Sequence, residues 1–447
     1  MLCHSTPYSR PPWAGMALAL AAAGIAMALS TPANAAVTEE TSFIFNTFSF
    51  LVHGFLVLWM AAGFACLEAG LVRTKSVSTI LLKNITLFSI AGIAFYLVGY
   101  ELMYDGVDGG FIGSFGIWQA DDSQALSGDF SAGYASSSDW FFQMLFVATA
   151  ASIVSGTLAE RIKLWPFFVF VFFLAALIYP IQGAWLWGGG WLAELGFADF
   201  AGSTLVHSVG GWAALVGAII LGARRGKYGQ DGTPQRISAS SLPLSTLGTF
   251  ILWLGWLGFN GGSQLALGSA ADAVAIANIY VNTTMASAGG VVAAVALTQL
   301  FRKKIDLTMV LNGALAGLVS ITAGPDTPTV GQAIMIGAIG SSLAVFTTPL
   351  LDRLKIDDVV GAIPVHLVAG VWGTLAVPLT NTDASIHIQL AGIGAIGFFV
   401  AASSAVVWLA LKWTVGLRLS QAEEALGIDK VELATMAYPG FRLTQPI

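Results

Sequence analysis

The chain has 447 residues, of which 56% are hydrophobic and only 10% are charged, and its mean hydropathy is +0.77. These values exclude a soluble globular protein and indicate a polytopic membrane protein. Because one helical span takes about 20 apolar residues, the length allows roughly ten spans and leaves no room for a large soluble domain. The sequence contains no G-x-x-x-x-G-K-[ST] phosphate loop, so an ATP-driven pump encoded in this chain is disfavoured.

The first 36 residues have the pattern of a secretory signal. Arg10 precedes an apolar run, and Ala33-Asn34-Ala35 has the small-x-small form of a signal-peptidase site. We expect residues 1–36 to be a cleaved signal peptide, 37–416 to be a transmembrane domain and 417–447 to be a cytoplasmic tail. The alternative is an uncleaved first transmembrane helix, which the short apolar run disfavours. Cleavage would leave Cys66 as a single thiol, with no intrachain disulfide.

Eleven apolar segments follow the predicted signal peptide. They cover residues 43–67, 79–103, 140–159, 165–186, 202–222, 243–261, 277–300, 306–323, 331–351, 358–379 and 386–416. With the N-terminus outside, every Lys and Arg except Arg10 falls on the cytoplasmic side, as the positive-inside rule requires. We expect Lys83, at the inner start of the second span, to snorkel back to the interface. The opposite loops carry acids without bases, which either concentrate cations at a pore mouth or are solvated acids of the usual kind.

One short pattern occurs twice. Val206-His207-Ser208-Val209-Gly210-Gly211 and Val365-His366-Leu367-Val368-Ala369-Gly370 share the form V-H-x-V-small-Gly, and the second histidine follows the first by 159 residues (366 − 207). The copies fall in predicted spans five and ten. Since five is odd, two five-helix repeats would cross the bilayer in opposite directions, which is an architecture common among transporters. We therefore predict an all-α fold of eleven transmembrane helices, with two inverted five-helix repeats around a central pore and a long eleventh helix outside.

Few residues in the predicted spans can carry chemistry. No group of Cys, His, Asp and Glu has metal-ligand spacing, so we expect no metal and no cofactor. The repeat places His207 and His366 at matched depths, and ionisable groups within spans are functional candidates by default. Two neutral imidazoles that share a proton could line an apolar passage. The alternative is a pair of separately satisfied structural histidines.

Three aromatic residues lie at the predicted outer ends of spans: Phe146 in span three, Trp187 in span four and Phe259 in span six. Tryptophan is common at any membrane interface, so Trp187 alone would be uninformative. However, each π-face can stabilise a cation by about 0.5 to 2 kcal/mol, increasingly as the cation loses water. The cluster therefore favours a small monovalent cation.

Several longer segments together resemble the ammonium transporter (Amt) family. They are LEAGLVR (67–73), LAERIKLWPF (158–167), WGGGWLAELGFADFAGSTLVH (187–207), GWLGFNGGSQL (255–265) and DDVVGAIPVHLVAGVWG (357–373). The resemblance runs from about residue 42 into the tail and keeps the order and spacing of the segments. The pattern D-F-A-G-x-T-x-x-H within it is far more specific than a pair of glycines.

The resemblance implies a role for each candidate residue. The set comprises an outer ammonium-binding vestibule of Phe142, Phe146, Trp187 and Ser263, a phenylalanine gate of Phe146 and Phe259, and the twin pore histidines His207 and His366. Asp199 matches an acidic residue near the outer end of span five. From chemistry alone we expect Asp199 to cap Ser203 or neighbouring amides and to support a cation electrostatically, without ligating it directly.

Size and dielectric indicate how such a pore would work. A bare cation in a narrow apolar tube is very costly, whereas a neutral amine loses only a few hydrogen bonds. We expect NH4+ to be recruited outside and deprotonated near the gate, NH3 to pass the histidines, and the proton to cross as well, which makes uptake electrogenic. Methylammonium is a candidate analogue. The alternative function is an ammonium sensor that signals through a partner protein. An enzyme is disfavoured, because two histidines without a facing carboxylate supply no activated nucleophile.

The predicted tail and the implied partners complete the expectations. The resemblance implies a homotrimer and, at the cytoplasmic tail, a PII-type signalling protein. Gly427-Ile428-Asp429 and Ala437-Tyr438 match the family pattern, but Glu432 to Met436 depart from it, and a solvated tail without a partner is the alternative. The signal peptide favours a bacterial cytoplasmic (inner) membrane, with the mature N-terminus outside and the C-terminus inside. The lipid bilayer is the remaining partner, and no nucleic-acid partner is expected.

Overall fold

The computed structural model describes residues 37–440, so the predicted signal peptide lies outside the described residues. Helices fill most of this range, which contains no β-sheet, and all of them belong to one unit that begins at Glu39. Nine helices within it are long and apolar enough to cross a membrane. They are α2 (Glu39–Leu71), Thr74–Tyr104, α6 (Ser136–Thr157), Leu164–Ala184, Ser203–Leu221, α11 (Leu242–Gly262), α12 (Ala270–Arg302), α14 (Val330–Arg353) and α16 (Ile386–Thr414).

Two shorter apolar helices coincide with predicted spans eight and ten. They are α13 (Leu307–Ile321) and the run Ile363–Leu379. The polytopic helical fold is thus confirmed, while the count of eleven spans stays a prediction. The observed helices α2 and α12 are each 33 residues long and extend beyond the predicted boundaries at both ends.

Three of the long helices and one of the two shorter ones contain a π-helical turn. The run Thr74–Tyr104 consists mainly of α3 (Val77–Ala94), the π turn Phe95–Gly99 and α4 (Tyr100–Tyr104). The run Leu164–Ala184 joins α7 (Leu164–Phe173) through Leu174–Ile178 to α8 (Tyr179–Ala184). The other two π turns are η4 (Ser203–Ser208), which leads into α10 (Val209–Leu221), and η5 (Ile363–Val368), which leads into α15 (Ala369–Ala376). π turns of this kind often mark functional positions. Each of the two predicted pore histidines lies in such a turn, His207 in η4 and His366 in η5.

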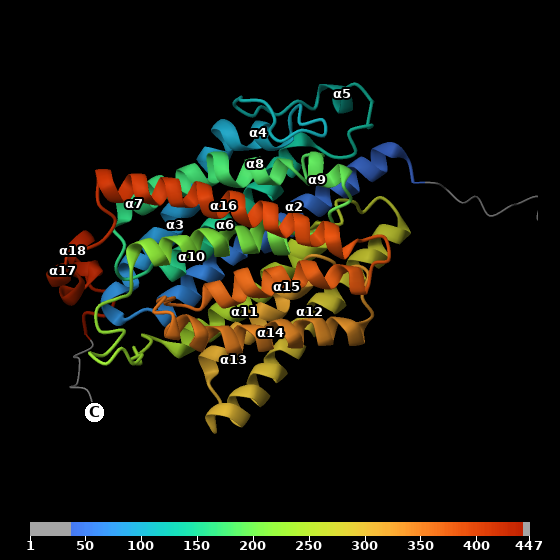
Figure 1. Ribbon diagram of the computed structural model, residues 1–447. Coiled ribbons are helices and arrows are strands. Elements are labelled where there is room, and N and C mark those ends of the chain that lie inside the picture. Colours follow the sequence, from blue (N-terminus) through green and yellow to red (C-terminus); the bar gives the residue numbers. More distant parts are fainter. Residues whose placement is uncertain (1–36, 441–447) are drawn as a thin grey trace, which may run out of the picture. The chain divides into compact units, whose positions relative to one another are not determined.

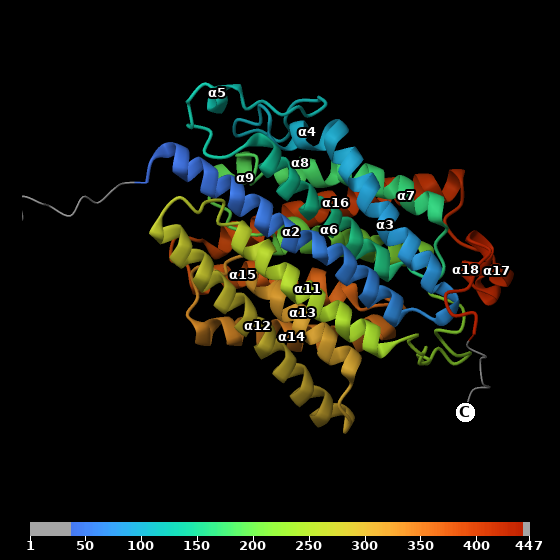
Figure 2. The ribbon, with the colours of Figure 1, turned by 180° about the vertical axis from the view of Figure 1, so that it is seen from behind.

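The helices pack closely along their length. In Figure 1, α16 lies lengthwise across the near face, next to α10, and Figure 2 shows α2, α3 and α12 on the opposite face. Helix α6 is the most deeply buried of the long helices, and it packs against α2, α3 and α10. Small residues allow close approach: a Cβ at Gly290 of α12 would lie 2.2 Å from the carbonyl oxygen of Gly313 in α13. Bulkier residues there would push these two helices apart.

The tail is ordered through residue 440 and packs against the end of the bundle. It forms α17 (Gln421–Leu426) and α18 (Ile428–Glu432), which both views place far from the short helix α9 (Trp191–Glu194). The Asp429 carboxylate accepts hydrogen bonds from the N–H groups of Ser78 (3.0 Å) and Thr79 (2.8 Å). This part of the tail therefore packs on the bundle, and whether it also binds a partner stays a prediction.

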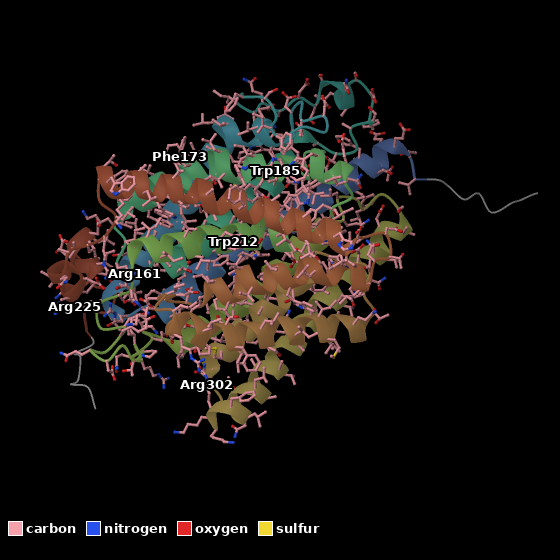
Figure 3. All side chains as sticks on the ribbon, in the orientation of Figure 1. Arg161, Phe173, Trp185, Trp212, Arg225 and Arg302 are labelled. Atoms are coloured by element: carbon pink, nitrogen blue, oxygen red, sulfur yellow. The ribbon has the colours of Figure 1, made fainter. Side chains whose placement is uncertain are left out.

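A buried ionic network lies beneath the tail helices. Glu424 of α17 accepts from the Arg418 guanidinium (2.8 Å) and from the N–H of Arg225, and Figure 3 shows Arg225 at this end of the bundle. Nearby, Arg224 pairs with Asp357 at 2.8 Å. Burial alone would raise the pKa of the Asp357 carboxyl, but Arg224 holds it well below its usual range. Glu424 therefore joins α17 to the backbone of Arg225, next to the buried pair of Arg224 and Asp357.

Candidate functional site

A continuous line of rings passes through the middle of the bundle. It runs from Trp187 through Phe146 and Phe259 to His207 and His366, with ring centres 5.9, 3.9, 5.3 and 5.3 Å apart in that order. The rings come from five different helical segments or their ends, and all but the half-buried Trp187 are buried. The residues that the sequence singled out as aromatic and histidine candidates are thus brought together.

The two phenylalanines of the predicted gate lie face to face. The rings of Phe146 in α6 and Phe259 in α11 have an interplanar angle of 23° at a centre separation of 3.9 Å. Phe142, one helical turn before Phe146, packs against it at 4.8 Å. Ser263, one turn beyond Phe259, is half-buried, and its hydroxyl donates to the Phe259 carbonyl oxygen at 2.8 Å. Phe142 and Ser263 therefore each contact one residue of the stacked pair.

The two histidines contact each other through the same ring atom. Nδ1 of His207 lies 3.2 Å from Nδ1 of His366 in a hydrogen bond. One ring must carry its proton on Nδ1 to donate, and the other must then carry its proton on Nε2 if both are neutral. Nε2 of His207 is buried and has no hydrogen-bond partner within residues 37–440. It can therefore bond to a small molecule that enters the passage.

Trp256 supports His207 and was not among the residues expected from the sequence. Its ring stacks on the imidazole of His207 at 4.7 Å with an interplanar angle of 18°. The Trp256 indole N–H donates to the Thr322 hydroxyl at 2.8 Å, which fixes the indole in turn. Trp256 lies three residues before Phe259 in α11, and that spacing places both on one helix face. The three-residue spacing from Phe259 could therefore have indicated Trp256 from the sequence alone.

Asp199 organises the start of the segment that carries His207. Its carboxylate accepts from four backbone N–H groups, those of Gly202 (3.0 Å), Ser203 (2.8 Å), Thr204 (2.8 Å) and Leu205 (2.9 Å). The expected capping is therefore confirmed. Burial raises the pKa of the Asp199 carboxyl to about 6, against the N–H bonds, which lower it.

The backbone at Asp199 also positions the tryptophan at the entrance. The Trp187 indole N–H donates to the Asp199 carbonyl oxygen at 3.1 Å. Gly202 has a φ of +103°, and a Cβ there would lie 2.5 Å from Val206 and 3.0 Å from the Trp187 ring. Trp187, Asp199 and Asp326 line a pocket of about 280 Å³, which is open at this end of the ring line. Asp199 and Asp326 are the two acidic residues of its lining.

Asp358 has the same relationship to His366, and the sequence analysis missed it. Its carboxylate accepts from the N–H groups of Gly361 (3.1 Å) and Ile363 (2.7 Å) at the start of η5. Asp358 follows Asp199 by 159 residues (358 − 199), the offset that also separates the histidines. Both halves therefore share the pattern D-x-x-G-x-x-x-x-H, and extending the short repeat upstream would have found this carboxylate.

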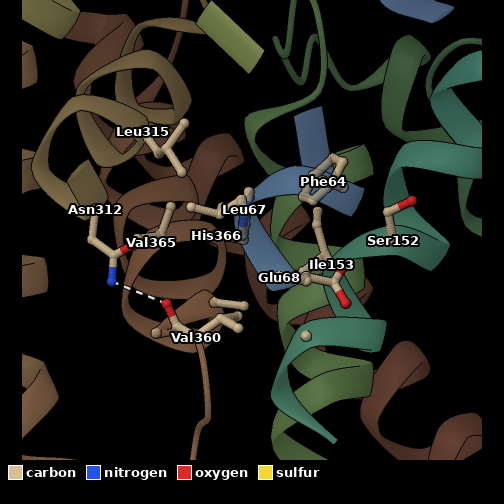
Figure 4. Close-up of a pocket in the computed structure, with 13 residues that line it drawn as sticks. Phe64, Leu67, Glu68, Ser152, Ile153, Asn312, Leu315, Val360, Val365 and His366 are labelled. Atoms are coloured by element: carbon tan, nitrogen blue, oxygen red, sulfur yellow. Dashed lines mark hydrogen bonds between the residues drawn. The ribbon is translucent and has the colours of Figure 1, made fainter. Parts of the chain in front are cut away.

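At the other end, the ring line reaches a narrow cavity. His366, Phe64, Ser152, Asn312 and Glu68 are among the residues that line it, and Figure 4 shows His366 near its centre. The cavity volume is about 10 Å³, which is room for about one water molecule. Within the described residues, no group of three or more His, Cys, Asp and Glu side chains could hold a metal ion.

A buried line of rings with a pocket at each end, inside a bundle of membrane-length helices, defines a polytopic membrane protein with a narrow passage. The ammonium transporter family model matches residues 48–438. The chain is 40% identical to the ammonium transporter Amt2 of Archaeoglobus fulgidus over 88% of each chain. It is 34% identical to Amt1 of Methanocaldococcus jannaschii, over 88% of this chain and 97% of the relative. The chain therefore belongs to the ammonium transporter family.

Solved structures agree with this assignment. The structure titled "Sensor Amt Protein" has a TM-score of 0.82 and 36% identity, and the match covers 89% of this chain and all of that one. The structure of Saccharomyces cerevisiae Mep2 has a TM-score of 0.76 and 25% identity, with 92% of this chain and 95% of that chain covered.

Proposed function

We propose that this protein transports ammonium, and that the ring line from Trp187 to His366 is its conduction path. The observation that carries the proposal is the hydrogen-bonded pair of buried imidazoles directly behind two stacked phenyl rings. A passage of this kind has no charge to hold a bare cation, but it has nitrogen atoms that can bond to a neutral amine. The names of the relatives supply the substrate, and the geometry is compatible with it.

Recruitment begins at Trp187. The π-faces of Trp187, Phe142 and Phe146, together with the Ser263 hydroxyl, hold NH4+ in place of its lost water. Asp199 is buried and fully engaged by backbone N–H groups, so it supports the cation through its charge and does not ligate it. Desolvation by the rings then favours loss of a proton near Phe259.

Conduction continues along the histidines. NH3 passes the gate and bonds to the free Nε2 of His207, then moves past His366 toward the cavity beyond. The proton crosses along the same pair, because the shared Nδ1–H can be held by either ring. Uptake is then electrogenic, with one positive charge moved for each ammonium.

The same proposal includes the orientation of the protein in the membrane and its assembly. The Trp187 end faces outward in a bacterial cytoplasmic membrane, and the end carrying α17 and α18 faces the cytoplasm, where basic residues gather. The protein assembles as a homotrimer with one pore in each subunit, and the exposed apolar side chains of α2, such as Phe48 and Phe55, meet lipid or a neighbouring subunit. The ordered tail is the surface offered to a PII-type regulator.

Ammonium-evoked current in proteoliposomes tests the function. We expect a current for the wild type and its loss, or loss of ammonium selectivity, when His207 and His366 are both changed to Ala. Stopped-flow pH measurements on the same vesicles report ammonia flux independently. Flux without current would make the protein a gas channel, and the absence of both would favour a sensor.

A further inference from the structure

The cavity beyond His366 contains a carboxylate that conduction, as proposed above, does not use. Glu68 of α2 lines this cavity together with His366, and Figure 4 shows both side chains at its wall. Glu68 is only 1% exposed, although it lies in a helix of membrane-spanning length. Ionisable residues buried at membrane depth are costly and are retained where they serve a function.

The two carboxylate oxygens of Glu68 have different surroundings. Oε2 accepts a hydrogen bond from the Ser155 hydroxyl at 2.7 Å. Oε1 is buried and has no hydrogen-bond partner within residues 37–440. A carboxylate kept only for stability would be expected to have both oxygens satisfied, because an unpartnered buried oxygen costs free energy. One oxygen is thus left available next to the cavity.

A buried lysine compensates the charge of Glu68 without occupying that oxygen. Lys83 of α3 is 2% exposed, so the expectation that it snorkels to the interface is wrong. Its ammonium group donates to the Ser155 carbonyl oxygen at 2.7 Å and lies 4.7 Å from the centre of the Phe167 ring. Glu68 therefore bonds to the hydroxyl group of Ser155, and Lys83 bonds to the backbone carbonyl oxygen of the same serine. The pair is neutral overall, as burial in an apolar bundle requires.

We propose that Glu68 receives the proton that leaves the histidine pair and releases it to water on the far side of the cavity. The inference rests on the proposed proton-coupled function. As an N–H bond of His366 breaks, an O–H bond forms at Oε1 of Glu68, directly or through the one water that the cavity can hold. The O–H bond then breaks toward bulk water, the carboxylate is restored and no electrons are transferred. The charged or titratable groups facing Glu68 are Lys83 from α3 and His366 from η5.

The test separates charge movement from amine movement. Glu68→Gln keeps the size and the Ser155 contact but cannot accept a proton, so we expect the ammonium-evoked current to fall about ten-fold or more. Ammonia flux by stopped flow should stay within about two-fold of wild type, because no gate or histidine is altered. Glu68→Asp, which keeps the carboxylate, should retain more current than Glu68→Gln.

The control is another buried carboxylate in the same kind of environment. Asp139 of α6 accepts from the Tyr100 hydroxyl (2.5 Å) and does not line the His366 cavity, so Asp139→Asn should leave the ratio of current to flux unchanged. A Glu68→Gln variant with the wild-type ratio would overturn the proposal while leaving ammonium transport intact. If Glu68→Gln does not fold, Glu68→Ala, which also lacks the carboxylate, takes its place, and a wild-type ratio of current to flux in that variant overturns the proposal. Absence of current in the wild type would instead reject proton coupling itself.

Discussion

The rings of Phe146 and Phe259 are in van der Waals contact, so the passage is closed at this point. Their centres are 3.9 Å apart, which leaves no space between the faces for even an ammonia molecule. Conduction along the proposed path would therefore require one ring to rotate aside. Because each ring is packed by others, Phe142 on one side and Trp256 on the other, that rotation is restricted and brief openings are expected.

Removing one ring of the stack should open the passage. We expect Phe259→Ala to reduce discrimination against larger amines such as methylammonium, measured as the ratio of methylammonium to ammonium current. A core Phe→Ala change costs about 3 to 5 kcal/mol, so melting temperature must be monitored as well. Phe250→Ala on the same helix is the matched control, because Phe250 is 64% exposed and lies outside the ring line. An unchanged selectivity ratio in Phe259→Ala would show that the stack does not select.

Gly202 should tolerate no side chain. Its φ of +103° and the 2.5 Å approach to Val206 predict that Gly202→Ala displaces the backbone that holds Trp187, with a loss of about 1 to 3 kcal/mol in stability. Ammonium affinity measured from the current should weaken with it. Gly394→Ala in α16 is the control, since a Cβ there meets nothing within 4 Å. Equal effects of the two substitutions would contradict this account of the entrance.

Asp358→Asn should impair transport although Asp358 lies outside the ring line. An amide has one acceptor oxygen, so the N–H groups of Gly361 and Ile363 and the Thr157 hydroxyl cannot all keep their partners. Bonds to a charged acceptor are worth about 1.5 to 3 kcal/mol each, and misplacement of His366 by one such loss would slow conduction roughly ten-fold. Flux in Asp383→Asn, an exposed acid, should stay at the wild-type rate. A normal rate in Asp358→Asn would show that η5 does not depend on this cap.

The tail should detach when Asp429 loses its charge. Asp429→Ala removes both acceptors of the Ser78 and Thr79 N–H groups, so limited proteolysis should cut residues 421–440 faster than in wild type. Lys430→Ala, at an exposed neighbouring position, should be cut at the wild-type rate. Equal protection of Asp429→Ala and wild type would mean that other contacts, such as those of Glu424, are sufficient.

Transport should decline in mild acid. The pKa of Asp199 is about 6 in the folded protein, so lowering the pH through that value neutralises the acceptor of four N–H groups and the charge that supports the cation. Ammonium itself stays protonated there, so a fall in initial uptake rate between about pH 7 and pH 5 would report on the protein. An initial uptake rate that stays constant across this pH range would contradict the role of the Asp199 charge.

The raised pKa of Asp199 also determines how the contribution of this residue to stability changes with pH. The reference pKa of Asp199 is 3.8, so between that value and about 6 the folded state holds a proton that the unfolded chain has released. The contribution of this group to the free energy of unfolding is therefore fully present below 3.8 and is lost as the pH rises through about 6. Melting curves across this window measure it.

The sequence predicted the membrane fold and the ring line because both leave strong local patterns. Apolar runs mark helices, and the repeated V-H-x-V-small-Gly marks the histidines. Glu68 was missed because it follows the predicted end of span one at residue 67, whereas α2 continues to Leu71 and carries it into the cavity. Lys83 was misplaced for a related reason: its partner Ser155 is on another helix, and no spacing in the sequence reveals that contact.

The bond between the histidines joins the same atom of two rings, which come from the two copies of the repeated sequence pattern, and this symmetry limits what the pair can determine. When the proton moves from one Nδ1 atom to the other, the donor and the acceptor change places and the same type of hydrogen bond remains. Such a pair can transfer a proton in either direction but does not by itself favour one direction. Any preference for inward over outward flow must then be set by the unlike ends, aromatic rings and Asp199 on one side and a carboxylate with its lysine on the other, and by the gradients across the bilayer.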